Sequence, residues 1–357
     1  MRVCVRSEAQ PNQENDGWAR DGMAIRYKLS RLSETSEGLD RAKKYYELSF
    51  TYNFERANDT VYFAFCMPYT YSKLQNHIRN ILKSPKQCVR EERLCFSLSG
   101  LPVPVLTVTS QVYKVGESGA PVEIDRSEFP EDCERPVHRF KKYIIVCARV
   151  HPGETSASFI MHGFLDFITG ASPEAVALRR THVFRIVPMT NPDGVIVGNY
   201  RTSFSGNDLN RQFLEPNKKL HPVVHNIKRL FKDIIAKALE PDPIATFVDI
   251  HGHSRKKSVF MYGPAYPLHC PKYFKARVLP KLLDEKSEIF RYYSCKFRVE
   301  KSKLKAARVV LNKEFGVTAC YTLEASMFGY IANDRSTQEL SAEMLNSHGQ
   351  DLGMCFS

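Results

Sequence analysis

The spacing of apolar residues changes near residue 141 and divides the chain into two parts. Before this point, short segments rich in Tyr, Phe and Val predict β-strands over 44–54, 60–71, 93–100 and 102–110, with a helix over 72–84. Residues 1–40 are polar and show no such pattern, which predicts an irregular, disordered start. The Gly, Pro and charged residues of 114–140 predict a surface excursion.

After residue 141, apolar runs alternate with segments of helical spacing. The runs predict strands over 142–150, 182–189, 244–250 and 320–328. The first is a continuous apolar run, as expected of a strand buried on both faces, and the second is predicted to be another buried strand. Apolar positions three or four residues apart predict helices over 155–170 and 223–239, with Gly170 as the stop of the first. This order predicts an α/β fold with a mixed, mainly parallel sheet flanked by helices.

Composition indicates a globular chain. With 357 residues and 43% hydrophobic residues, it is long and apolar enough to bury a core in one large domain or two smaller ones. No stretch approaches the ~20 apolar residues of a membrane span, and the N-terminus has no apolar segment of a secretory signal, so no membrane partner is expected. The ten cysteines are scattered without a C-x-x-C pair, and Cys147 and Cys320 fall in apolar runs as buried thiols. We therefore expect a reducing, cytoplasmic location.

The chain is basic, and this narrows the class of partner. A formal charge of +12 and a pI of about 9.1 favour acidic partners, among which nucleic acid, anionic lipid and acidic polypeptides qualify. Zinc-finger spacing, an RNP-like aromatic motif and a basic block of five residues are all missing from the sequence. No nucleic acid partner is therefore expected.

One short motif places metal-binding side chains at a strand end. In "ARVHPGETSAS", His151 and Glu154 follow the predicted strand 142–150, and His251 follows the strand 244–250. Because parallel strands end at the same rim of a sheet, these side chains are expected to meet there. Two imidazoles and one carboxylate form the donor set of a catalytic zinc site. His253 is an alternative to His251, and a His three residues before a Glu also occurs by chance.

Longer segments carry a resemblance to a known family. They are "RVHPGETSAS", "PMTNPDGVIVGNYRTSFSGNDLNRQF", "DIHGHSRKKSVFMYG" and "ARVVLNKEFGVTACYTLEASMFG", with "MPYTYSKLQNHI" before them. In this order they resemble the zinc metallocarboxypeptidases, and within them the cytosolic carboxypeptidases that trim glutamate from tubulin and other proteins. The resemblance implies a catalytic domain over 67–357, preceded over 1–66 by a remnant of a β-sandwich domain.

The resemblance also implies roles for individual residues. His151, Glu154 and His251 look like the ligands of one Zn²⁺ per chain, and Asp208 looks like the acceptor that orients His151. Asn210 and Arg211 look like the clamp on the substrate's terminal carboxylate, since a guanidinium bonds a carboxylate through two parallel hydrogen bonds. Arg201 looks like the cation at the developing oxyanion. Glu324 looks like the general base that activates the zinc water and then protonates the leaving amine.

If the residue removed is glutamate, the pocket for its side chain needs a buried or partly buried cation. Arg308 has the position that the resemblance implies for this cation. The neighbouring lysines 301, 303 and 305 are interpreted as a solvated basic loop. The leading hypothesis is removal of glutamates from C-terminal or side-chain tails of tubulin or other glutamate-tailed proteins, in the cytoplasm and in association with microtubules or cilia. The alternatives are a zinc amidohydrolase of N-acyl amino acids and an inactive, basic module that binds microtubules.

Overall fold

The computed structural model describes residues 2–9, 17–30, 44–83, 88–110, 141–239 and 241–357, together with the backbone of 113–115 and 121–123. These residues form two compact units, Met1–Pro68 and Tyr69–Ser357. The β-sandwich origin expected for 1–66 and the catalytic role expected for 67–357 stay predictions.

The first unit consists of short antiparallel strands. They are β1 (Val3–Ser7), β2 (Ala19–Asp21), β3 (Met23–Leu29), β4 (Tyr46–Thr51) and β5 (Val61–Ala64). Strand β1 pairs with β2 and β5, and β3 pairs with β4. The expectation that residues 1–40 are irregular is therefore wrong for β1, β2 and β3. Most positions of β2 and β3 are exposed, so these strands lack the apolar alternation by which a strand is recognised. The rest of that expectation, at 10–16 and 31–40, lies outside the described residues, as do 116–120 and 124–140 of the predicted excursion.

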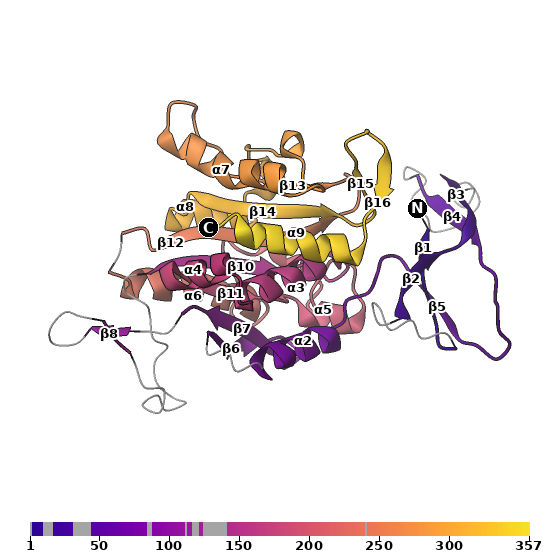
Figure 1. The fold of residues 1–357 in the computed structure, drawn as a ribbon, viewed down its shortest axis with the longest axis horizontal. Coiled ribbons are helices and arrows are strands. Elements are labelled where there is room, and N and C mark those ends of the chain that lie inside the picture. The colour runs from indigo at the N-terminus through magenta and orange to yellow at the C-terminus, as the bar shows by residue number, and fades with distance from the viewer. Residues whose placement is uncertain are drawn as a thin grey trace. The chain divides into compact units, whose positions relative to one another are not determined.

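The second unit is built on a seven-stranded sheet in the order β13-β14-β12-β10-β11-β7-β6 (Figure 1). The strands are β6 (Val89–Phe96), β7 (Pro102–Val108), β10 (Lys142–Ala148), β11 (His182–Val187), β12 (Ile244–His253), β13 (Val259–Tyr262) and β14 (Ala319–Ser326). The four central strands β14, β12, β10 and β11 are parallel, whereas β13, β7 and β6 are antiparallel to their neighbours. Two-stranded pairs β8–β9 (Tyr113–Val115, Pro121–Glu123) and β15–β16 (Gly329–Ile331, Thr337–Glu339) lie outside this sheet.

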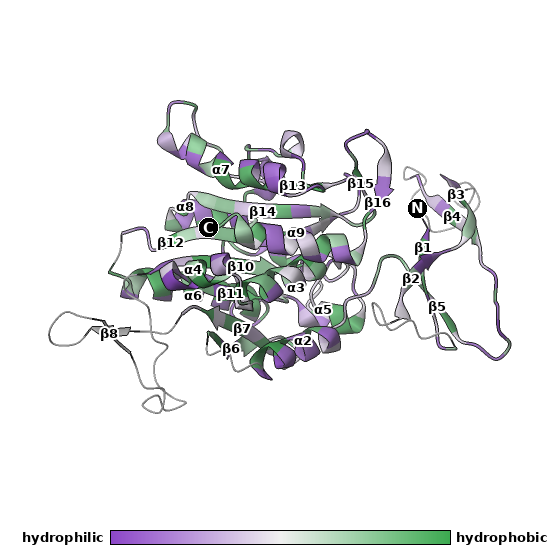
Figure 2. Ribbon diagram, in the orientation of Figure 1, coloured by the Kyte–Doolittle hydropathy of each residue, from purple (hydrophilic) through white to green (hydrophobic). Residues whose placement is uncertain are grey.

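Helices cover both faces of the sheet. They are α2 (Tyr71–Lys83), α3 (Ser156–Thr169), α4 (Pro173–Thr181), α5 (Pro192–Val197), α6 (Pro222–Lys237), α7 (Pro271–Lys286), α8 (Ala307–Phe315) and α9 (Ala342–Met354). Helices α3 and α9 pack side by side on one face, and α6 and α8 cover the other, where Ile145 and Cys147 of β10 join the core. Figure 2 shows the central strands largely in hydrophobic colours, while exposed helices such as α2 carry both colours. Burial on both faces explains why β10 and β11 consist mainly of apolar residues, and the buried Arg185 of β11 is paired with Glu92.

The predicted fold is confirmed in this second unit. The central sheet is mixed and mostly parallel, and it is flanked by helices. The four predicted strands correspond to β10, β11, β12 and β14, and α3 ends at Gly170 as expected. Segment 60–71 is a strand only over Val61–Ala64, and residue 71 already belongs to α2. Cys147 and Cys320 are buried free thiols. Within the described ranges, no helix combines the length and the apolar character needed to cross a bilayer.

Glycines allow α3 and α9 to approach each other closely. A Cβ added to Gly349 of α9 lies 2.0 Å from the carbonyl oxygen of Ile160 and 2.6 Å from the backbone nitrogen of Phe164. A Cβ added to Gly163 of α3 lies 1.8 Å from the carbonyl oxygen of Asn346. These neighbours are backbone atoms of packed helices, which cannot move aside as a flexible side chain does.

We expect Gly349→Ala to destabilise the chain by about 3 kcal/mol, at the upper end of the cost of overpacking a core. The sign of this change in the free energy of unfolding is informative, because a glycine-to-alanine change inside an unhindered helix normally stabilises the helix by about 1 kcal/mol. Urea unfolding measures the difference, and Gln350→Ala on the exposed side of the same helix is the control. A Gly349→Ala variant as stable as the wild type argues against this close approach.

Candidate active site

Three parallel strands bring the predicted residues to one rim of the sheet. His151 lies three residues beyond the end of β10, and His251 lies within β12, which continues to His253. Glu324 belongs to β14, where it is the register partner of His251. His151, His251 and Glu324, which lie between 73 and 173 positions apart in sequence, therefore meet because their strands are neighbours.

The loop that carries His151 and Glu154 is held by hydrogen bonds. Arg149 is buried, has a left-handed backbone with φ of 59°, and donates to Pro152 O at 2.8 Å and to Ser158 Oγ at 2.8 Å. Gly153 N donates to Tyr200 O at 2.8 Å. A side chain at residue 153 would meet the Tyr200 ring at 2.5 Å, so the sharp turn requires glycine. The loop thus fixes His151 and Glu154 before any ligand binds.

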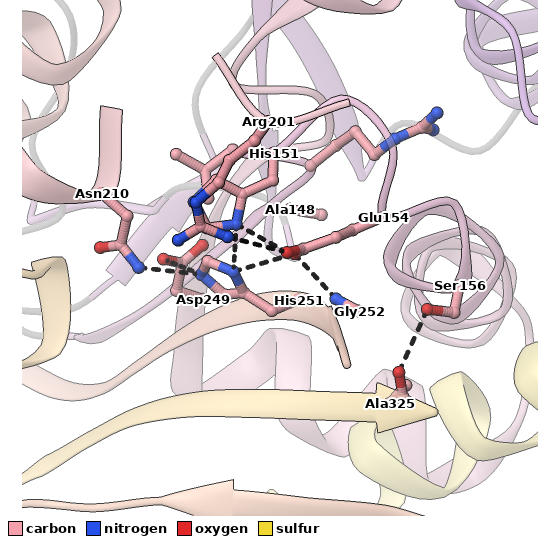
Figure 3. A network of polar contacts seen from close by, with 12 residues as sticks. Ala148, His151, Glu154, Ser156, Arg201, Asn210, Asp249, His251, Gly252 and Ala325 are labelled. Atoms are coloured by element: carbon pink, nitrogen blue, oxygen red, sulfur yellow. Dashed lines mark hydrogen bonds and ion pairs between the residues drawn. The ribbon is translucent and has the colours of Figure 1, made fainter. Parts of the chain in front are cut away.

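Donor atoms of His151, Glu154 and His251 converge at one point, as Figure 3 shows. His151 Nδ1 lies 2.8 Å from Glu154 Oε1, and His251 Nδ1 lies 3.1 Å from Glu154 Oε2. The two Nδ1 atoms are 3.2 Å apart. A tetrahedral Zn²⁺ with bonds of about 2 Å needs donors roughly 3.3 Å apart, so the three atoms have nearly the required spacing.

A carboxylate lies behind each histidine. His151 Nε2 is 2.9 Å from Asp208 Oδ1, and His251 Nε2 is 2.7 Å from Asp249 Oδ2. A carboxylate accepts a hydrogen bond and does not donate one, so each Nε2 carries the proton and each Nδ1 presents its lone pair. Such partners fix the tautomer and the ring direction of metal-binding histidines. Asp249 was not predicted, although its position two residues before His251 on one strand face is a signal for it.

The electrostatics of the group favour a cation. Burial alone would lower the pKa of His251, but the carboxylates of Asp249 and Glu154 raise it well above its ordinary value. Burial would raise the pKa of Glu154, but hydrogen bonds with His151 and His251 hold it below its ordinary value. The raised pKa of His251 shows that positive charge is favoured between these donors, and a bound cation would take the place of the proton on Nδ1. The donor set fits Zn²⁺, which the three residues would hold from their Nδ1 and carboxylate atoms.

Glu324 lies on the wall of the cleft that also contains His151, Glu154 and His251. Burial raises the pKa of Glu324 to about 7, and the nearby carboxylate of Glu154 acts in the same direction. A carboxyl group near neutrality is suited to accept a proton and later to return it. The structure therefore places the residue predicted as general base beside the predicted metal ligands.

The second predicted group, Arg201, Asn210 and Arg211, lies on the same cleft. Arg201 Nη2 is 2.8 Å from Asp208 Oδ2, and its Nη1 is 3.7 Å from Glu154 Oε1. Arg211 Nη1 donates to Asn210 O at 2.9 Å. Asn210 Oδ1 accepts from the backbone of α8, at Ala307 N, at 2.9 Å. Asp208 therefore contacts Arg201 as well as His151, a link that the sequence did not predict.

Cations outnumber anions on the lining of the cleft. The basic residues are Arg201, Arg211, Arg255, Lys296, Arg298, Lys303 and Arg308. The acidic ones are Glu154, Glu300 and Glu324. Arg255, Lys296 and Arg298 were not predicted, because they come from loops that only the fold brings together. Lys303, interpreted as part of a solvated basic loop, is half-buried and lines the cleft, whereas Lys301 and Lys305 are exposed.

Arg308 is the most buried of the seven cations that line the cleft, with 6% of its surface exposed. Its Nε has no hydrogen-bond partner among the described residues, and its guanidinium lies 5.3 Å from the centre of the Tyr262 ring. Burial lowers the pKa of Arg308, although Glu324 opposes this shift. A buried guanidinium on a cleft wall with an unused donor is suited to bind an anionic group.

Two other histidines near the site in sequence, His253 and His221, lie outside the donor group. His253 Nδ1 accepts from the backbone nitrogens of Arg255 and Lys256, at 3.2 and 2.9 Å. His221 precedes α6 and its Nδ1 accepts from Asn217 N at 3.2 Å. The alternative that His253 replaces His251 as a donor is not what the geometry supports. The roles given to the residues of the cleft stay predictions.

Known proteins are similar to this chain in both sequence and fold. The zinc carboxypeptidase family matches residues 74–273. Cytosolic carboxypeptidase 1 of Danio rerio is 39% identical over 345 residues, which cover 92% of this chain and 28% of the relative. Cytosolic carboxypeptidase 2 of Danio rerio is 35% identical over 359 residues, which cover 100% of this chain and 45% of the relative. The chain thus spans less than half of the length of these relatives.

Solved structures show the same fold at lower identity. A metallo-carboxypeptidase from Pseudomonas aeruginosa, in complex with (2-guanidinoethylmercapto)succinic acid, has a TM-score of 0.72 and 21% identity, covering 99% of this chain and 79% of that chain. The resemblance found in the sequence is confirmed by these relatives. The chain belongs to the zinc carboxypeptidase family, and its relatives in that family include the cytosolic carboxypeptidases.

Proposed function

We propose that this chain is the catalytic part of a zinc carboxypeptidase that removes glutamates from C-terminal or side-chain polyglutamate tails of tubulin or other acidic proteins in the cytoplasm. Support for a carboxypeptidase comes from the family match and from the convergence of His151, Glu154 and His251. The names of the relatives support a cytosolic location. The single observation that carries the choice of an acidic substrate is the basic cleft, with Arg308 buried in its wall.

The chemistry follows from the positions of the side chains. When bound by His151, Glu154 and His251, zinc supplies a Lewis acid that lowers the pKa of a water and polarises a carbonyl. Glu324 accepts the proton of the attacking water and transfers it to the leaving amine. The guanidinium of Arg201 stabilises the negative charge that develops on the carbonyl oxygen.

Binding of the substrate uses the remaining cations. Arg211 and Asn210 hold the terminal α-carboxylate, for which a guanidinium has the matching planar geometry. Arg308 meets the side-chain carboxylate of the last glutamate. Lys296, Arg298 and Arg255 attract the acidic residues that precede it, because clefts lined by one sign of charge concentrate ligands of the opposite sign. A polyglutamate tail, as on tubulin, would satisfy all of these cations, and microtubule association follows from the same charge.

Two other functions would use parts of the same site. A zinc amidohydrolase of N-acyl amino acids would use the same metal residues, but it has no need of a cleft with seven cations. An inactive module that binds microtubules would keep the basic surface, but it has no need of Glu324 beside three converging donor atoms. Both alternatives are outcomes of the same experiment.

The experiment offers the zinc-loaded protein peptides that end in several glutamates, peptides that end in Tyr, Leu or Lys, small N-acyl amino acids, and microtubules. The proposal predicts stepwise loss of glutamate alone. Hydrolysis of acyl amino acids without peptide cleavage supports the amidohydrolase. Co-sedimentation with microtubules without turnover supports the inactive module. Mass spectrometry of the peptides and of tubulin tails measures the first outcome.

Arg308 tests the specificity separately. We expect Arg308→Gln to lower kcat/KM for glutamate-ended peptides by about 100-fold, since a hydrogen bond to a charged group contributes about 1.5–3 kcal/mol. Activity toward leucine-ended peptides is expected to stay the same or to rise. The control is Lys305→Gln, which removes a charge three residues away that lies outside the cleft lining. An equal loss for glutamate and leucine ends would assign Arg308 to general packing instead of recognition.

A further inference from the structure

A second group of metal-binding side chains lies away from the cleft. Among the described residues, His77, His162 and Asp166 place one ligand atom each within 4.8 Å of one another. His77 belongs to α2, whereas His162 and Asp166 are four residues apart on α3 and so share one helix face. None of the three lines the cleft, so the carboxypeptidase chemistry does not account for them.

The distances within this group are close to those of a metal site. His77 Nε2 is 2.7 Å from Asp166 Oδ1, and His162 Nε2 is 3.6 Å from Asp166 Oδ2. These values lie on either side of the roughly 3.3 Å between donors of a tetrahedral ion with bonds of about 2 Å. The two imidazole rings are stacked with centroids 3.4 Å apart and planes 7° from parallel. Because the rings are nearly parallel, they would have to tilt toward each other to direct both Nε2 atoms to one ion.

Tyr69 orients one of the rings. Its hydroxyl lies 2.9 Å from His162 Nδ1. This contact occupies Nδ1 and leaves Nε2 directed toward Asp166, as the outer partners of metal-bound histidines do.

Burial of the side chain decreases from His77 to His162 and from His162 to Asp166. The side chains of His77, His162 and Asp166 are 8%, 23% and 46% exposed. Solvent can therefore reach the carboxylate side and supply a water as the fourth ligand. Lys73 is the cation whose charge acts on His162, and it weakens binding of another cation here. The site is expected to bind more weakly than the site at His151.

We propose that His77, His162 and Asp166 form a second, peripheral site for a divalent transition-metal ion of the zinc, cobalt, nickel or copper class. Imidazole with a carboxylate suits these ions. The ion would link α2 to α3, and this link matters because α2 buries only Leu74, His77 and Ile78. A ligand that binds only the folded state stabilises it.

The test measures zinc stoichiometry by equilibrium dialysis on tag-free, chelator-stripped protein. The wild type is expected to hold two ions per chain. The variants His162→Gln and Asp166→Asn are each expected to hold one, because the dissociation constant of the second ion rises at least tenfold. Glu154→Ala is expected to retain one ion, and Glu154→Ala with Asp166→Asn none. The control is Asp233→Asn, a carboxylate of matched exposure (42%) on α6, which should hold two.

Thermal unfolding gives a second readout. Zinc should raise the Tm of Glu154→Ala but not that of the double variant. One ion in the wild type and none in Glu154→Ala would overturn the proposal, and so would unchanged zinc affinities in both His162→Gln and Asp166→Asn. In those cases the cluster is an ordinary ion pair beside two stacked rings. Neither readout depends on catalysis, so failure of the proposed glutamate removal would leave this result intact.

Discussion

Glu324→Gln is expected to lower kcat for a glutamate-ended peptide by about 1000-fold, within the range of 10²–10⁴ that general acid–base catalysis contributes. Glutamine keeps the size of the side chain but cannot accept the proton of the attacking water. Because Glu324 is not among the three converging donors, zinc affinity and peptide affinity should stay nearly unchanged. Steady-state kinetics, together with zinc analysis of the same preparation, measures both quantities.

Glu300→Gln is the matched control, since Glu300 also lines the cleft but is exposed. It should retain most of its activity. A loss in Glu324→Gln that comes mainly from KM, or that accompanies loss of zinc, would assign Glu324 to binding instead of proton transfer. Normal turnover in this variant would remove Glu324 from the mechanism.

Glu154→Ala is expected to weaken zinc binding at the His151 site by at least about 1000-fold and to abolish peptidase activity. This factor exceeds the 10–100-fold loss of metal affinity that typically follows removal of a residue that hydrogen-bonds a metal ligand without binding the metal itself. Glu154 supplies the only carboxylate among the three donors, and its removal also leaves Gly252 N without its acceptor at 2.9 Å. Competition with a chelator, followed by metal analysis, measures the affinity.

Asp249→Asn provides a graded comparison, because an amide can still contact His251 Nε2 but carries no charge. It should weaken zinc binding by about 10–100-fold. Circular dichroism verifies that both variants are folded. If zinc binds equally well to Glu154→Ala and to the wild type at this site, Glu154 is not a ligand.

The second unit was largely predictable from the sequence because its strands are buried. β10 and β11 consist mainly of apolar residues, and His151, Glu154 and His251 were expected where parallel strands end at one rim. Glu324 was predicted from the family resemblance alone. Burial on both faces restricts a strand to mainly apolar residues, and the position where a strand ends determines which side chains can meet at the rim. These two constraints are local, so they are visible in a single chain.

The remaining features depend on contacts between distant loops. Arg255, Lys296 and Arg298 reach the cleft from loops whose path has no local signal. The pairing of Arg201 with Asp208 requires the folded turn between them. In the first unit, β3 is exposed at six of its seven positions, so its sequence does not alternate as that of a half-buried strand does.

An anomalous difference map at the zinc edge, from crystals of the zinc-loaded chain, tests the central claim most directly. We predict a peak about 2 Å from His151 Nδ1, from the Glu154 carboxylate and from His251 Nδ1. A map with no peak between these atoms, or with zinc bound through His253 instead, would contradict the account.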